Sequence, residues 1–165
     1  MLAQDFIDNC KALVGQSYEL TDCIGVVRKA LGIQCQGTNW LWRSINNSAK
    51  YKYLTFRSTT LPDAITPGTV LFKVQFDVIP SGYSDKPNCY HIGVPVGDGM
   101  VVDSTPKYGV RLRNLYPDEW DAWGELKQVE FSSVDYPEND PPPLRADADD
   151  LLREIYRLIS DYLED

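Results

Sequence analysis

The clearest structural signal in this sequence is CYHIGVPVGDGMVVDST, residues 89–105. Two apolar runs flank the turn residues Gly97, Asp98 and Gly99, and this pattern predicts an antiparallel β-hairpin. Pro95 lies within the first run, and because proline lacks a backbone N–H it indicates either an edge strand or a β-bulge. The hairpin therefore predicts an antiparallel sheet around which the other elements are arranged.

The predicted hairpin brings two ionisable side chains together. His91, the only histidine of the chain, and Asp103 each lie six residues from Gly97. We therefore expect them to lie nearly opposite each other, with both side chains on one face of the sheet. An aspartate in that position can orient an imidazole and stabilise its protonated form. The alternative is a polar cross-strand pair without a chemical role.

A second stretch, TDCIGVVRKALG at residues 21–32, predicts a short helix. Thr21 or Asp22 can cap its N-terminus, and Gly32 can end it. Apolar side chains at three- and four-residue steps then form one buried face. With either cap, Cys23 falls in the first turn of the predicted helix.

Cys23 is expected in the first helical turn, a position with chemical consequences. The helix dipole and the unpaired N–H groups of that turn favour an anion, so we expect a lowered thiol pKa. Gly25 would let a substrate backbone approach, and the backbone N–H of Cys23 could donate to an oxyanion. A cysteine that only packs in the interior is the alternative.

The remaining elements predict an α+β domain. A helix is expected over residues 2–14, with Cys10 as a small apolar filler on its buried stripe. A short helix over 40–46 and a loop to residue 60 follow. Further strands are expected over residues 69–78, 109–115 and 123–134. Helices thus precede a mostly antiparallel sheet of about five strands.

The segment between residues 35 and 60 is rich in aromatic side chains. They either line a groove for a sugar or a peptide, or pack within the domain. These residues are Trp40, Trp42, Tyr51 and Tyr53.

Length and charge limit the possible functions. The chain has 165 residues and a net charge of −8, most of it in the last 31 residues, so residues 1–134 are nearly neutral. No basic patch suits nucleic acid, and no apolar run is long enough to span a membrane. The N-terminus lacks the order of a signal peptide. We therefore expect synthesis in the cytoplasm and, for any action outside, release by lysis or within a larger assembly.

The C-terminal residues predict two separate segments after a main domain at 1–134. Residues 135–148 form an acidic, proline-rich linker. Residues 149–165 predict an amphipathic helix whose apolar face needs a partner. That partner is either the domain's own surface, a second copy of the chain, or a larger assembly.

The four cysteines do not suggest a metal site or a disulfide framework. They lie at positions 10, 23, 35 and 89, with no CxxC pair. A Cys3His zinc site that includes Cys89 and His91 is the weaker alternative, and a chain of this size does not need disulfides. We expect neither a metal nor another cofactor.

Taken in order, several short motifs resemble those of the NlpC-type cysteine peptidases, papain-like enzymes that cut bacterial cell-wall peptides. The corresponding pieces here read GQSYEL, TDCIGVV, TPGTVLFKV, HIGVPVGDG and VVDST, within residues 3–131. The resemblance implies a papain-like fold with Cys23 as nucleophile, His91 as base and Asp103 as the orienting residue. Tyr18 and Asp22 match residues beside the nucleophile.

The chain also departs from the family pattern. Ile24 stands where serine is usual, the glycines before the cysteine are missing, and Asp103 stands where His, Asn or Gln is more frequent. Along with Ile24, we expect Gly25 and Ser104 to line the site. The resemblance extends to compact members encoded by phages and prophages.

The resemblance implies hydrolysis of an amide bond in peptidoglycan stem peptides by a thiol mechanism. Two other classes stay open. One is a structural module of a phage tail or secretion assembly that retains the papain-like fold without activity. The other is an acyl-transfer or amidase variant on the same scaffold.

Overall fold

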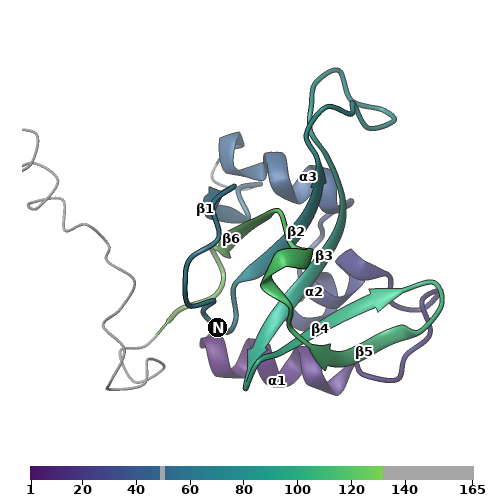
Figure 1. The fold of residues 1–165 in the computed structure, drawn as a ribbon, viewed down its shortest axis with the longest axis vertical. Coiled ribbons are helices and arrows are strands. Elements are labelled where there is room, and N and C mark those ends of the chain that lie inside the picture. The colour runs from purple at the N-terminus through teal and green to yellow at the C-terminus, as the bar shows by residue number, and fades with distance from the viewer. Residues whose placement is uncertain (49–50, 132–165) are drawn as a thin grey trace, which may run out of the picture. The chain divides into compact units, whose positions relative to one another are not determined.

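Three short helices and one antiparallel sheet of six strands form the part of the protein described in a computed structural model (Figure 1). The structure describes residues 1–48 and 51–131, within the first of two units of the chain, which ends at Asp135. The helices are α1 (Ala3–Ala12), α2 (Cys23–Leu31) and α3 (Thr38–Arg43), with short 3₁₀ turns η1 (Ser44–Asn46) and η2 (Pro117–Glu119). The strands are β1 (Leu54–Ser58), β2 (Val70–Gln75), β3 (Asn88–Gly97), β4 (Met100–Thr105), β5 (Gly109–Asn114) and β6 (Ala122–Leu126).

The strand order in the sheet is β1-β6-β2-β3-β4-β5, and every neighbouring pair is antiparallel. The α+β class with helices before the sheet is confirmed. The predicted linker at 135–148 and the predicted helix at 149–165 lie outside the described residues. Within the ranges that are described, no helix combines the length and apolar character needed to cross a bilayer.

β1 is the strand that the sequence does not predict, so the sheet has six strands rather than about five. It pairs with β6 at the edge of the sheet, and its register shifts between Leu54 and Phe56. Leu54 is buried, whereas Phe56 is exposed and rests against Trp123 with ring centroids 5.0 Å apart. An edge strand with one buried position lacks the alternation that marks a strand in a sequence.

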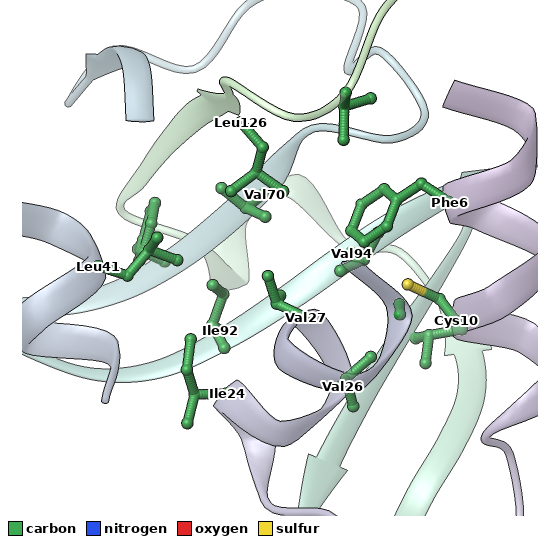
Figure 2. Packing of buried hydrophobic residues seen from close by; sticks show 14 of the residues in the cluster. Phe6, Cys10, Ile24, Val26, Val27, Leu41, Val70, Ile92, Val94 and Leu126 are labelled. Atoms are coloured by element: carbon green, nitrogen blue, oxygen red, sulfur yellow. The ribbon is translucent and has the colours of Figure 1, made fainter. Parts of the chain in front are cut away.

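The main hydrophobic core lies between the helices and one face of the sheet (Figure 2). Phe6 and Cys10 come from α1, Val27 from α2, and Ile92 and Val94 from β3, and each is no more than 1% exposed. Burying a side chain of this kind contributes about 1.5–3 kcal/mol. Cys10 therefore lies among apolar side chains, as interpreted from its place on the helical stripe.

A smaller cluster, separate from the main core, is formed by Leu71, Val101 and Trp120. Leu71 and Val101 alternate along β2 and β4 with residues of the main core, so the small cluster lies on the other face of the sheet. Partly buried Leu61 and Leu115 pack against it. Both faces of the central strands are thus covered near this cluster.

The predicted hairpin is formed by β3 and β4. Asp98 and Gly99 have φ angles of 53° and 65°, which is typical of the two-residue turns that join twisted antiparallel strands. Gly97 pairs with Met100, and the register shifts between Pro95 and Gly97. Because β3 lies between β2 and β4, Pro95 marks a bulge and not an edge strand.

Both ends of α2 follow from the residues that flank it. Asp22 is the N-cap, and its Oδ1 accepts a 2.7 Å hydrogen bond from the backbone N–H of Gly25. Gly32 ends the helix with a φ of 66°, which glycine adopts without a steric cost. Thr21, the other candidate cap, instead donates to the Gln16 side chain.

Candidate active site

The structure brings the three predicted catalytic residues to one cleft. Cys23 at the N-terminus of α2, His91 on β3 and Asp103 on β4 all line a cavity of about 720 Å³. Tyr18 and Ser104, both expected near the site, line the same cavity. Residues from α2, the preceding loop, β3 and β4 therefore converge at one position.

Hydrogen bonds to the sheet hold the segment that leads into α2. The Ser104 hydroxyl, fully buried on β4, donates a 2.6 Å hydrogen bond to the carbonyl of Thr21. Earlier in the loop, Gly15 donates to the carbonyl of Val110, and Val110 donates to the carbonyl of Gln16, both at 2.9 Å. The start of α2 is thereby fixed beside β4 and β5.

Cys23 and His91 come to the cleft from opposite sides of the sheet, where one strand pairing ends. Along β3, Ile92 faces the main core beneath the helices, so His91 faces the opposite side of the sheet. The pairing of β3 with β4 ends at Gly93 and Asp103, whereas β3 continues along β2 to Asn88. The Cys23 thiol lies beside this part of β3, where the Ile92 backbone hydrogen-bonds its ionised form and lowers its pKa.

His91 and Asp103 form the expected pair, but in a different register. Gly93, and not His91, lies directly opposite Asp103. His91 is the diagonal neighbour on the same face, and its Nε2 lies 3.2 Å from Oδ2 of Asp103. The bulge after Pro95 and the two-residue turn set this offset. With the proton on Nε2 directed at the carboxylate, Nδ1 is left as the basic nitrogen.

Asp103 is also bound by two arginines of β5. Arg111 Nε donates to Oδ1 at 2.8 Å, and Arg113 Nε donates to Oδ2 at 3.0 Å. The Asp103 side chain is 1% exposed. Burial raises the pKa of Asp103, but hydrogen bonds from His91 and Arg111 and the charge of Arg113 outweigh it and hold the pKa well below its usual range. The carboxylate therefore stays ionised.

The pKa of the Cys23 thiol differs from the expectation. Burial, followed by the negative charge of Asp22, raises the pKa of Cys23 to about 11. Backbone hydrogen bonds from Ile24, Ile92 and Cys23 itself lower it by a smaller amount. The expected lowering by the helix N-terminus is present, but desolvation and the neighbouring carboxylate exceed it. In the unliganded protein the thiol is protonated near neutral pH.

The other cysteines are less accessible than Cys23. All four are free thiols, and only Cys23 is partly exposed. Burial also raises the pKa of Cys35 to about 11 and that of Cys89 to about 12. Access to solvent, rather than pKa, therefore distinguishes Cys23.

Trp120, which sequence reasoning does not select, packs against the face of the His91 ring. The two rings stack with centroids 5.8 Å apart and an interplanar angle of 15°. Trp120 is 4% exposed and occupies the space above Gly93, where an added Cβ would lie 2.5 Å from its Cη2 atom. Gly93 therefore leaves room for the ring that orients His91.

The expected site residues beside Cys23 have different roles. Burial, then the charges of Cys23 and Asp22, raises the pKa of Tyr18, so its hydroxyl lies near both groups. Ile24 is 3% exposed and packs in the main core rather than lining the cavity. At Gly25 an added Cβ would lie 2.6 Å from Oδ1 of Asp22, so the missing side chain accommodates the helix cap and not a substrate.

Several charged residues of the cleft are absent from the sequence prediction. Arg111 lies directly opposite Asp103 in the β4–β5 ladder. A signal in the sequence could have found both arginines. Residues 109–113 alternate as Gly, Val, Arg, Leu and Arg, and a turn at 106–108 would place Arg111 and Arg113 on the same face of the sheet as Asp103. Further charged and aromatic residues line the cleft at Lys73, Tyr90, Tyr116 and Glu119.

The aromatic segment between residues 35 and 60 divides between packing and a groove. Trp42 is buried, packs edge-on against Phe72 at 5.2 Å between ring centroids, and has the Arg57 guanidinium 4.3 Å above it. A second cavity of about 920 Å³ is lined by residues that include Trp40, Tyr51 and Tyr53.

Comparison with known proteins adds no assignment: the chain matches no model of a known protein family and no curated protein sequence. Among residues 1–48 and 51–131, no group of three or more His, Cys, Asp or Glu side chains is placed to hold a metal ion.

Proposed function

We propose that this protein is a papain-like cysteine peptidase that hydrolyses an amide bond in peptidoglycan stem peptides. The main supporting observation is the contact between His91 and an ionised Asp103 in the cleft that also contains Cys23. The ordered motif resemblance supplies the substrate class. A cleft that a cysteine at a helix N-terminus shares with a histidine on an antiparallel sheet is compatible with a papain-like arrangement.

In the proposed mechanism, Nδ1 of His91 accepts the proton of the Cys23 thiol as the sulfur attacks the scissile carbonyl. Asp103 keeps the other proton on Nε2 and stabilises the imidazolium. The backbone N–H of Cys23, free of an intrahelical partner in the first turn, is available to the oxyanion. The imidazolium then protonates the leaving amine, and water, deprotonated by the same nitrogen, releases the acyl group.

The raised thiol pKa determines how this mechanism begins. A thiol with a pKa of about 11 is ionised to a negligible extent at pH 7. Proton transfer to His91 must therefore accompany substrate binding or attack, since a substrate that displaces water from the cleft strengthens the thiolate–imidazolium attraction. Stable ion-pair formation before binding is not required.

The pH dependence of Cys23 alkylation tests the cysteine–histidine pairing. Iodoacetamide labelling would be followed from pH 5 to 10 by mass spectrometry of the Cys23 peptide. The peptidase proposal predicts a labelling rate that depends on His91, with a rate in His91→Gln at least about tenfold lower at pH 7. Cys89 in the unfolded protein provides the control for an unassisted thiol. A profile that is identical in the parent and in His91→Gln contradicts the pairing.

Digestion of purified peptidoglycan tests the reaction and the bond. Released peptides would be identified by mass, with one new amine and one new carboxyl group per cleavage. Cys23→Ser should lose the activity, whereas Cys35→Ser, which changes another free thiol, should retain it. Products that still form with Cys23→Ser would exclude the thiol mechanism.

A non-catalytic structural module is the second candidate, and one observation favours it. The thiol pKa of about 11 for Cys23 is no lower than that of the buried Cys35. A protein that uses the cleft only for binding has no need of an activated thiol. Equal alkylation of Cys23 in the parent and in His91→Gln, together with an undigested cell wall, would favour this candidate. An acyl-transfer variant would instead release peptides joined to an added amine.

A further inference from the structure

The His91 side of the cleft contains more positive than negative side chains. Lys73, Arg111 and Arg113 line it together with the carboxylates of Asp103 and Glu119. Arg113 bridges the two acids, with Nε 3.0 Å from Asp103 and Nη1 2.9 Å from Glu119. Lys73 Nζ lies 3.7 Å from the same Glu119 oxygen. One positive charge of this group is therefore left without a matching carboxylate.

Arg111 is the most exposed of these three cations, and most of its hydrogen-bond donors are unused. Of its five N–H groups, Nε–H alone is engaged, with Asp103. Within the described part of the chain its two Nη groups make no hydrogen bond. The Arg111 side chain is 32% exposed, whereas that of Arg113 is 17% exposed. A guanidinium with two free nitrogens thus faces the cleft.

Two contacts hold the Arg111 guanidinium in place before any ligand binds. Nε is tied to Asp103, and Cζ lies 4.7 Å from the ring centroid of Tyr108. Such stacking on an aromatic ring and one fixed hydrogen bond reduce the entropy that arginine loses on binding. The two Nη groups match the spacing of the two oxygens of a carboxylate.

We propose that Arg111 binds a carboxylate of the substrate and so selects substrates with a negative charge close to the bond that is cut. That the bound carboxylate belongs to a substrate rests on the proposed peptidase function, whereas the anion site itself depends only on the charges and contacts of the cleft. The bound carboxylate would balance the unmatched positive charge. Because Arg111 also contacts Asp103, the carboxylate would lie on the side of Asp103 away from His91.

Two alkylating agents of similar size measure this site without a substrate. Iodoacetate carries a carboxylate and iodoacetamide is neutral, so the ratio of their rates at Cys23 cancels the thiol pKa and its accessibility. At low salt, Arg111→Gln should lower the ratio of iodoacetate to iodoacetamide about three- to tenfold, as expected for one unit charge across a cleft of intermediate dielectric. In the unchanged protein the ratio should fall as salt is added.

Matched variants separate the local charge from the total charge. Lys86→Gln removes one positive charge from the loop between β2 and β3, outside the cleft, and should leave the ratio unchanged. Arg111→Lys keeps the charge and should keep most of the ratio. An Arg111→Gln ratio equal to that of the unchanged protein, or a ratio in the unchanged protein that is independent of salt, overturns the proposal.

A peptide pair then tests the role of the site in the reaction. One peptide has a free carboxylate next to the scissile amide, and the other has that carboxylate converted to an amide. The acid should have the higher kcat/KM, and Arg111→Gln should reduce that preference at least about fivefold. If both peptides stay intact while the alkylation ratio responds to Arg111, the peptidase proposal fails and the anion site stands. If both are cut equally well, the carboxylate preference is refuted and the peptidase proposal stands.

Discussion

Replacing Gly93 with alanine should displace Trp120 and disturb the orientation of His91. The new Cβ would lie 2.5 Å from Cη2 of Trp120, 3.0 Å from Cζ2 of the same ring and 2.9 Å from Cγ2 of Val101. Real Cβ atoms do not approach other atoms so closely, so something must move. Trp120 and Val101 are 4% and 0% exposed, and neither can shift toward solvent without opening a gap.

The magnitude follows from the size of this overlap. Inserting a methyl group into a well-packed region costs about 1–3 kcal/mol. The ring that must move also stacks on His91 at 5.8 Å between centroids, so part of the strain is transmitted to the imidazole. We therefore expect Gly93→Ala to lower the free energy of unfolding by about 1–3 kcal/mol and to slow the iodoacetamide labelling of Cys23 at pH 7.

Guanidinium denaturation followed by tryptophan fluorescence measures the first effect, and mass spectrometry of the Cys23 peptide measures the second. Gly37→Ala is the matched control, because no atom lies within 4 Å of a Cβ at that position and its φ is extended. The double variant Gly93→Ala with Trp120→Phe should be less destabilised than the sum of the single changes by at least about 0.5 kcal/mol. Additive effects, or a Gly93→Ala protein as stable as the parent, would refute the steric argument.

Three further changes test the groups around the cleft. Asp103→Asn should lower the free energy of unfolding at pH 7 by about 2–4 kcal/mol, since it removes a buried anion that contacts two partly exposed arginines. The folded-state pKa of Asp103 lies below its ordinary value, so this contribution is present above about pH 4 and is lost as the pH falls further. In denaturant titrations, the difference in stability between the parent and Asp103→Asn should therefore be smaller at pH 2 than at pH 7. An equal difference at the two pH values would contradict the pKa direction. Asp22→Ser keeps an oxygen for the helix cap but removes the negative charge that raises the pKa of Cys23. The pH profile of Cys23 alkylation should therefore move to lower pH. An unmoved profile would argue against an effect of the Asp22 charge on the thiol pKa. Ser104→Ala removes the hydrogen bond to the Thr21 carbonyl and should cost about 1–2 kcal/mol in urea denaturation, whereas an unchanged midpoint would mean that the anchor is dispensable.

Features that depend on nearby residues could be predicted from the sequence. The turn at Asp98 and Gly99, the cap at Asp22 and the end of α2 at Gly32 are set by φ angles and hydrogen bonds within a few residues. The contact of His91 with Asp103 was predictable for the same reason, because a tight hairpin leaves few possible registers. The offset of that pair was not, since it depends on which two residues form the turn and on a bulge that no local pattern specifies.

The sequence by itself determined that helices precede an antiparallel sheet, the hairpin, and which cysteine begins a helix. Only the tertiary structure decided that a strand at Leu54–Ser58 extends the sheet, that Trp120 covers Gly93, and that two arginines share Asp103. It also decided the thiol pKa of Cys23, where desolvation outweighs the helix terminus. The physical reason is the same in each case: burial, packing and charge compensation depend on atoms brought together from distant parts of the chain, whereas caps and turns depend on neighbours.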